Sequence, residues 1–470
     1  MIGKVLVTID QADFLRGMSS GTHINDGGFS NAVEGLNLKL VPGVVYAAAT
    51  GVDSDTDNVL NGDIVASAPD HSTRVRLAVS SAGEAVSYNG TKLAAVHDTD
   101  SVNTYAAGFS HMANFGGETY YTSKQIAKQW AGTATFDGGA GFPFTFANNN
   151  VPHPVLEFEN NLFYGDGNLL LRQTSTGTAP STLMTLSADQ VIIALGIDPG
   201  TGRLLISTTT NWDTNGTGVN TGINKLHWHD GSSNKSTKTV IIGNQILSFE
   251  TVGSTTYVGY GKNLGFVSGS GVQWLRDLNN VRYFQNELPY QNKITSAGNI
   301  LYISNNLEVL AYGEVQAGRK IFWTVLTQKK SSASIKALFT AGNVASSDTI
   351  KLGISYSTNQ FDTYDLTSIS DVDKFDFPTN VYSFERPVHI KNIYLEFKDA
   401  LTSTSNLTLT ITNQDANVNT VTIPISETST RTIRKTQGFH TKYETFKFRI
   451  EDSTNNAGLK RIIVYGNVAE

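Results

Sequence analysis

Two histidines near the middle of the chain have the spacing of a metal site, in the run His227-Trp228-His229-Asp230. Residues two apart on a strand point to the same side, so the two imidazoles could share a zinc or copper ion. A zinc site needs three or four protein ligands, and no third ligand is identifiable around this run. We interpret it as a polar strand end before a turn, and we predict no metal and no cofactor for the chain.

An acidic stretch, Asp53 to Asp63, places carboxylates at alternate positions in the manner of a calcium loop. In that loop a glycine follows the third acidic residue and a glutamate closes the motif. Here those two places hold Asn58 and Ile64. The pattern therefore favours a solvated acidic loop over a calcium site.

Catalytic motifs are sparse. A glycan hydrolase needs a pair of carboxylates, or an arginine cluster facing an acidic substrate. Carboxylates such as Asp166 and Glu250 are present, but their positions in the sequence do not pair them. Up to residue 319 there are eight arginines: Arg16, Arg74, Arg76, Arg172, Arg203, Arg276, Arg282 and Arg319. No serine-hydrolase, zinc-protease or phosphate-loop motif is present. We predict that the chain is not an enzyme.

The elements that would position these residues are short strands in a repeated hairpin. A small or polar turn is followed by an apolar-aromatic triplet, a break and a second strand. The anchors of successive copies are about 42 to 52 residues apart, the period of a four-stranded propeller blade: Tyr121, Tyr164, Ile206, Val258 and Tyr302. Extrapolation backwards reaches Arg74–Ser80 and then Val41–Ala48, which predicts six or seven blades. The longest interval contains the polar stretch Thr208–Asn224, interpreted as a loop joining two blades.

Helical periodicity is nearly absent, and only Ser123–Gly132 could carry a turn or two. Beyond residue 318 the strands become longer and alternate cleanly. We predict an all-β chain with three parts: an N-terminal docking segment at 1–30, a degenerate β-propeller at 31–318, and a β-sandwich of jelly-roll or Ig-like type at 319–470.

Composition narrows the classes of function. Charged residues are only 16% and cysteine is absent, which excludes charge-laced helical arrays, disulfide frameworks and Cys-ligated metals. Residues 1–318 hold 17 basic and 26 acidic side chains, a net charge of −9, whereas the remainder carries +3. A protein that grips nucleic acid neutralises phosphates with basic residues, so specific DNA binding is not expected. No signal peptide and no membrane span are predicted.

The segment Ala12–Ala48, followed by hairpin blades and a C-terminal β-region ending in Lys460–Gly466, resembles tailed-bacteriophage virion proteins, in particular the tail nozzle of short-tailed phages. The matching residues are assigned to assembly and docking: Asp13, Phe14, Gly17, Gly28, Phe29, Pro42 and Gly43. In that family a propeller and flanking β-domains assemble as a six-fold ring whose channel conducts DNA.

The resemblance implies a structural protein of the virion tail, synthesised in the host cytoplasm and forming a hexameric ring. Its implied partners are copies of itself, tail adaptor or portal-side proteins, tail fibres, and double-stranded DNA that passes without specific binding. An acidic lumen would repel phosphates and keep the genome mobile. Two alternatives stay open: a carbohydrate-binding propeller that recognises a host receptor, and a glycan hydrolase.

Overall fold

The computed structural model describes residues 4–9, 18–19, 29–30, 38–41, 44–47, 52–53, 60–69, 76–88, 93–99, 103–106, 108–130, 142–210, 212, 222–260, 263–269, 271–275, 293–304, 309–316, 319–326, 334–343, 346–357, 360–366, 375–378, 382–401, 406–413, 418–424, 430–435, 442–452 and 459–468. These residues form strands and turns and contain no α-helix. Accordingly, none of them belongs to a helix long and apolar enough to cross a membrane.

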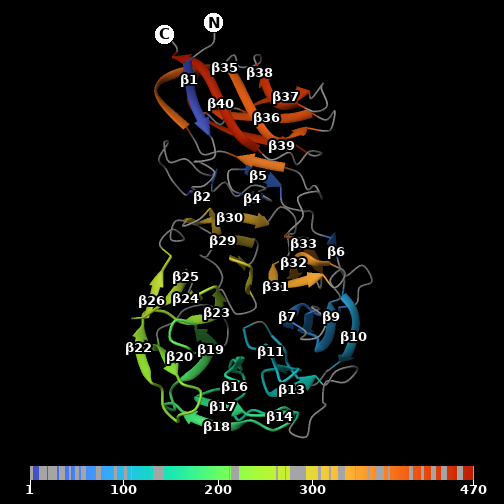
Figure 1. Cartoon of the computed structure of the whole chain (residues 1–470), viewed down its shortest axis with the longest axis vertical. Coiled ribbons are helices and arrows are strands. Elements are labelled where there is room, and N and C mark those ends of the chain that lie inside the picture. The colour runs from blue at the N-terminus through green and yellow to red at the C-terminus, as the bar shows by residue number, and fades with distance from the viewer. Residues whose placement is uncertain are drawn as a thin grey trace. The chain divides into compact units, whose positions relative to one another are not determined.

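The described residues form seven four-stranded sheets, which we call blades 1 to 7 (Figure 1). Blades 1 to 4 consist of β7 (Ile64–Pro69), β8 (Arg76–Ser80), β9 (Glu84–Tyr88) and β10 (Leu93–Thr99); β11 (Met112–Phe115), β12 (Glu118–Thr122), β13 (Ile126–Trp130) and β14 (Phe144–Thr145); β15 (Val155–Phe158), β16 (Asn161–Asp166), β17 (Leu169–Gln173) and β18 (Ser181–Thr185); and β19 (Val191–Asp198), β20 (Arg203–Thr209), β21 (Asn224–His229) and β22 (Lys238–Ile242).

Blades 5 to 7 follow the same plan, except that the fourth strand of blade 7 precedes blade 1 in the sequence. They consist of β23 (Ile246–Val252), β24 (Thr255–Tyr260), β25 (Asn263–Ser268) and β26 (Gly271–Trp274); β27 (Ile294–Ala297), β28 (Ile300–Ser304), β29 (Val309–Gln316) and β30 (Arg319–Leu326); and β31 (Ile335–Asn343), β32 (Ser346–Tyr356), β33 (Phe361–Asp365) and β6 (Val52–Asp53).

The first strands of the blades form a closed ring. Contacts run from β7 through β11, β15, β19, β23 and β27 to β31, which returns to β7. These seven first strands lie in one compact unit, Gly51–Leu307 with Ala333–Thr367, whereas β29 and β30 of blade 6 fall in the other unit. Four-stranded sheets in contact around a ring are the architecture of a β-propeller. The predicted all-β propeller is therefore confirmed, with seven blades.

Strand β6 closes the ring by backbone pairing. Val52 pairs with Thr363 and Asp53 with Asp362, about 310 positions away in the sequence. On the blade 1 side of the closure, the Tyr88 ring packs edge-on against Phe339 and Phe361 of blade 7, at centroid distances of 6.0 and 5.7 Å. Aromatic pairs of this kind stabilise beyond the apolar area that they bury.

Neighbouring blades are held together by apolar side chains buried between them. Blades 4 and 5, for example, share a cluster that includes Leu205, Trp228 and Val258. Gly196 lies so near blade 5 that a Cβ there would sit 2.4 Å from the Phe249 ring. Only glycine fits this approach without displacing its neighbour.

The second compact unit comprises Met1–Thr50, Glu308–Ser332 and Ser368–Glu470. Its main element is a ten-stranded sheet in which β35 pairs with three partners. The strands are β1 (Lys4–Ile9), β4 (Leu38–Val41), β5 (Val44–Ala47), β34 (Phe375–Pro378), β35 (Tyr382–Leu401), β36 (Asn406–Asn413), β37 (Val418–Pro424), β38 (Thr430–Lys435), β39 (Lys442–Asp452) and β40 (Leu459–Val468). Buried residues alternate along β35 and β40, as expected for strands with one apolar face.

The predicted hairpin repeat is confirmed. Each of the five anchors, Tyr121 to Tyr302, lies in the second strand of its blade, and Arg74–Ser80 leads into β8 in the same place of blade 1. The turns predicted before those strands contain residues with positive φ, including Gly117 at 86° and Gly253 at 60°. Glycine suits such turns because it lacks a Cβ.

Four sequence interpretations differ from the structure. Val41–Ala48 is not a blade, because β5 belongs to the ten-stranded sheet. The stretch Ser123–Gly132 contains strand β13 and not a helical turn. The polar stretch Thr208–Asn224 extends from the end of β20 to the first residue of β21, so it connects two strands of one blade. Blade 7 occupies residues predicted to belong to the sandwich.

The predicted boundaries at residues 30 and 318 also differ from the division into compact units. Strands β31 and β32 are long, like those of a sandwich, and the fourth strand of this blade, β6, is remote in sequence. Nothing local marks them as a blade. The strands beyond Ser368 join one connected sheet with segments from before the propeller, not an independent domain from residue 319.

Candidate functional site

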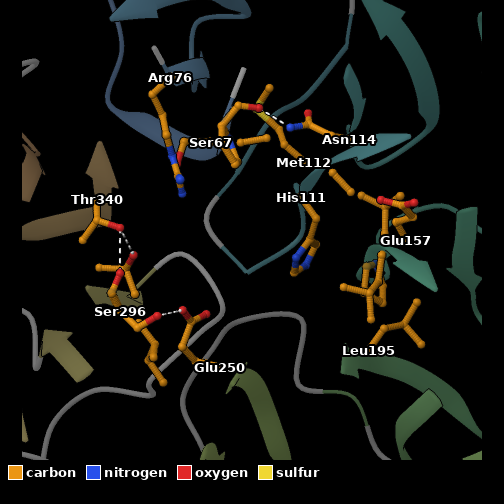
Figure 2. A pocket seen from close by; sticks show the side chains of 18 of the residues that line it. Ser67, Arg76, His111, Met112, Asn114, Glu157, Leu195, Glu250, Ser296 and Thr340 are labelled. Carbon is orange, nitrogen blue, oxygen red and sulfur yellow. Dashed lines mark hydrogen bonds between the residues drawn. The ribbon is translucent and has the colours of Figure 1, made fainter. Parts of the chain in front are cut away.

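A cavity of about 580 Å³ lies where the blades converge, and every blade contributes to its wall (Figure 2). The wall comes mainly from the first strands of the blades, together with Arg76 at the start of β8. The volume falls within the range of roughly 300 to 1,000 Å³ typical of small-molecule sites. Four titratable groups line this cavity: Arg76, His111, Glu157 and Glu250.

The Arg76 guanidinium points into the cavity. Its Nε donates a hydrogen bond to Ser67 Oγ at 3.3 Å, and its Cζ lies 5.5 Å from the centroid of the Phe339 ring. Burial lowers the pKa of Arg76 to about 10, an effect that attraction to Glu250 opposes. Arg76 therefore stays charged at neutral pH. Within the described part of the chain, no carboxylate lies within 4 Å to form an ion pair with it.

Glu250 on β23 faces the same space. Its Oε1 accepts a hydrogen bond from Ser296 Oγ at 2.6 Å, and the Ser296 carbonyl accepts one from Thr340 Oγ1 at 2.8 Å. Burial raises the pKa of Glu250, while the Ser296 hydrogen bond and the charge of Arg76 act to lower it. Burial prevails, so ionisation of this carboxyl costs free energy in the folded protein.

His111 approaches the cavity from the other side, just before β11 (Figure 2). Its backbone is fixed because its N–H donates to Thr122 Oγ1 at 3.0 Å and its carbonyl accepts from the Thr122 N–H at 2.9 Å. The side chain is 4% exposed, and its Nε2 has no hydrogen-bond partner among the described residues. Burial, and next the nearby His153, lower the pKa of His111 to about 3, so the ring is neutral at physiological pH.

The cavity thus presents one cation, two carboxylates and one neutral imidazole on a wall that also carries hydroxyl groups and aliphatic side chains. Such a mixture can bind a small polar molecule, because a few placed polar groups orient a ligand while apolar groups exclude water.

The two histidines of the sequence motif lie elsewhere, on β21 of blade 4. The ring nitrogens of His227 contact Thr208 Oγ1 at 3.1 Å and Thr239 Oγ1 at 3.0 Å. The Nδ1 of His229 accepts from the Gly231 N–H at 2.9 Å, and its Nε2 donates to the Ser233 carbonyl at 2.8 Å. All four ring nitrogens are therefore engaged by neighbouring groups.

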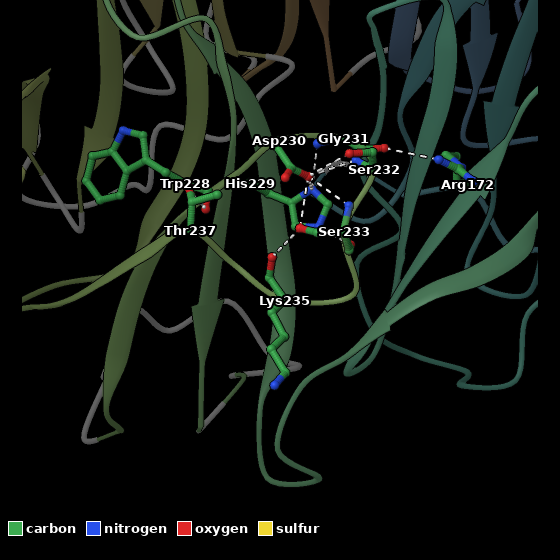
Figure 3. A network of polar contacts seen from close by, with 9 residues as sticks. All are labelled: Arg172, Trp228, His229, Asp230, Gly231, Ser232, Ser233, Lys235 and Thr237. Atoms are coloured by element: carbon green, nitrogen blue, oxygen red, sulfur yellow. Dashed lines mark hydrogen bonds and ion pairs between the residues drawn. The ribbon is translucent and has the colours of Figure 1, made fainter.

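Figure 3 shows the turn that follows, in which Asp230 acts as an acceptor. Its Oδ1 receives the N–H groups of Ser232 and Ser233 at 2.9 and 2.8 Å, as well as both hydroxyls. These bonds hold the pKa of Asp230 well below its ordinary value of 3.8. The turn is a structural device in which side chains replace water as partners of the backbone.

The acidic stretch is seen only at its ends, because Asp55, Asp57 and Asn58 lie outside the described residues. At its far end the chain is anchored by Glu84 of β9. The Glu84 carboxylate accepts the Asn61 N–H at 2.8 and 2.9 Å, the Gly62 N–H at 3.2 Å and the Ser80 hydroxyl at 2.7 Å.

The residues predicted for docking also fall largely outside the description: Asp13, Phe14, Gly17, Gly28, Pro42 and Gly43. Phe29 belongs to the short strand β3 (Phe29–Ser30), whose backbone pairs in parallel with β2 (Met18–Ser19). Their assignment to docking stays a prediction.

Of the two carboxylates noted in the sequence, only Glu250 reaches the cavity. Asp166 instead accepts the N–H groups of Ala147 and Asn148 at 2.7 and 2.9 Å, which anchors the chain between blades 2 and 3.

His111 belongs to none of the motifs identified in the sequence. A usable signal existed, because Glu250, Ser296 and Thr340 are 46 and 44 positions apart. The blade period could have placed them at equivalent positions facing the axis.

No protein-family model and no curated protein matches the chain. Among solved structures it is similar to Raptor from Chaetomium thermophilum, with 7% identity and a TM-score of 0.44 over 69% of this chain. The match spans 30% of the Raptor chain.

The WD40 domain of Pan2 from Neurospora crassa gives 7% identity and a TM-score of 0.44, covering 69% of this chain and 96% of that one. The BBS1N chain, from a complex with ARL6DN, is 13% identical with a TM-score of 0.43, and the match covers 69% of this chain and 100% of that one. The fold assignment rests on the strand pairings of the chain itself.

Proposed function

We propose that the chain is a structural protein of a bacteriophage tail and acts by assembly, as part of a ring, and not by catalysis. The observation that supports this is that, in the sequence, the propeller is inserted between segments that form a second β-unit. The ten-stranded sheet takes β1, β4 and β5 from before the propeller in sequence, and β34 to β40 from after it. A propeller combined with flanking β-structure is what the resemblance to tail nozzles implies.

In this proposal the partners are copies of the same chain in a six-fold ring, adaptor or portal-side proteins, tail fibres, and passing DNA. The net charge of −9 over residues 1–318 supports a passive role toward DNA. An acidic wall repels phosphates, whereas a basic one would release counterions and hold the duplex.

The test is the oligomeric state of the purified full-length chain, by light scattering and negative-stain microscopy. Rings of six subunits are expected, including in mixtures with the tail proteins expressed alongside it. A chain that stays monomeric under all these conditions would contradict the proposal.

DNA binding gives a second measurement. At about 50 mM salt, where non-specific binding is strongest, no retention of duplex DNA is expected. Tight binding under those conditions would contradict the proposed conduit role.

A further inference from the structure

Several polar groups in the central cavity have no partner of their own. Within the described residues, the terminal nitrogens of Arg76 and the carboxylate of Glu157 make no hydrogen bond, and Glu250 uses one oxygen only. Polar groups that face a cavity and are not used by the protein itself can orient a small ligand there.

The polar groups that the cavity offers to a ligand are acceptors at Glu250 and Glu157 and donors at Arg76.

The positions of these groups favour a ligand with many hydroxyls. Arg76 and Glu250 reach in from blades 1 and 5, and Glu157 from blade 3 (Figure 2). One ammonium or one carboxylate cannot satisfy groups that approach from different directions. Hydroxyl groups distributed around a sugar ring can, because each both donates and accepts.

The charge of the site points the same way. One arginine against two glutamates gives no excess of positive charge, so an anionic ligand would meet net repulsion. A neutral ligand keeps the attraction between Arg76 and Glu250 and adds hydrogen bonds to both. Aliphatic side chains of Met112, Leu156 and Leu195 offer contact to the C–H faces of a sugar.

We propose that the central cavity of the propeller binds a neutral mono- or disaccharide, with Arg76 donating to its hydroxyls and Glu250 accepting from them. This is independent of the proposed ring assembly and is tested separately. No aromatic ring among the described lining residues, other than the His111 imidazole, offers a stacking platform, so the affinity is weak, with a Kd of about 1 mM.

The experiment is ligand-observed NMR and calorimetry on the full-length chain. The probes are glucose, galactose, mannose and their β-linked disaccharides, compared with glucuronic acid as an anion and glycine as a zwitterion. Saturable binding of at least one neutral sugar is expected, with no binding of the two charged probes.

Two variants locate the binding. Glu250→Gln keeps the side-chain shape but removes an acceptor of hydroxyl protons, and should weaken binding at least tenfold. Arg76→Gln should do the same. The control Asp189→Asn makes the same change of charge at an exposed position in the turn before blade 4, and should leave binding unchanged.

Three results would overturn the proposal. Glycine or glucuronic acid could bind in place of the sugars, which would assign another ligand class. A sugar could bind equally well to Glu250→Gln, which would place it elsewhere. No probe could bind at up to about 50 mM, which would make the cavity a water-filled channel. Since Arg76→Gln is the variant at greater risk of misfolding, Glu250→Gln and the direct binding measurement keep the test decisive.

Discussion

Glu84 and Glu250 belong to the same ring of blades but have opposite surroundings. Glu84 is 2% exposed and accepts bonds from two backbone N–H groups, from the Asn61 amide at 2.6 Å and from the Ser80 hydroxyl. Glu250 accepts one side-chain bond and faces a cavity that also holds Arg76. A carboxylate surrounded by hydrogen-bond donors fixes the backbone that donates to it. A carboxylate with few donors can still accept hydrogen bonds from a ligand.

The largest expected effect tests the first half of this contrast. Glu84→Gln replaces an oxygen by an NH₂ group that faces the N–H donors of Asn61 and Gly62. Because those donors lose a charged acceptor, the free energy of unfolding should fall by about 3 kcal/mol. Urea denaturation checks this value. An unchanged midpoint would mean that the Leu60–Asp63 segment is held by other contacts.

A pH effect of intermediate size comes from the cavity side. The pKa of His111 is about 3 in the folded protein, below its ordinary 6.5. Between these two values the His111 ring is protonated in the unfolded chain but stays neutral in the folded one. Stability therefore falls as pH decreases from 7 to 5, by about 2 kcal/mol for this residue.

His111→Gln should remove that part of the acid sensitivity. His227 has a pKa lowered to about 4 and acts in the same direction, so the informative quantity is the difference between variant and parent. Melting temperatures at pH 7 and pH 5 measure it. Equal losses on acidification in both proteins would show that the ring is not shielded from water.

Asp230 gives a smaller effect, because the carboxylate is partly exposed although it receives several bonds. Asp230→Ala should cost about 1 kcal/mol, as for the loss of a helix-capping side chain. Since its folded pKa is depressed, this contribution is present above pH 3.8 and is lost as pH falls below that value. The difference in melting temperature between variant and parent should therefore shrink in acid, and a constant difference would contradict the assignment.

The smallest effect completes the comparison. Glu250→Gln makes the same chemical change as Glu84→Gln, yet burial raises the pKa of Glu250, so its ionisation opposes folding above pH 4.5. The variant should unfold at the same urea concentration as the parent, or slightly higher, within about 0.5 kcal/mol. A loss as large as that of Glu84→Gln would show that Glu250 is an anchor and that the contrast is wrong.

The sequence predicted the blades better than the site. Anchors such as Tyr164 and Val258 recur because each blade repeats the same buried second strand, and that period is visible in one sequence. Blade 7 could not be assigned in this way, since its fourth strand β6 comes from the other side of the propeller.

The cavity depends on the same kind of long-range closure. Arg76, His111 and Glu250 belong to blades 1, 2 and 5, and only the ring brings them together. The pair His227 and His229 attracted attention through local spacing, but its partners come from adjacent strands and serve the turn. Local spacing identifies residue types, whereas the ring determines which of them share a space.

The pairing of β6 with β33 also constrains when the protein can fold during synthesis. Val52 leaves the ribosome early, but its partner Thr363 is translated about 310 codons later. At about 5 to 20 residues per second, the propeller waits roughly 15 to 60 seconds with its ring open and the edge of blade 7 still to come. Strand β1 waits longer, because Ile9 pairs with Ile462. Exposed strand edges invite pairing with other chains, so the early strands need to be short or protected by other factors during that interval.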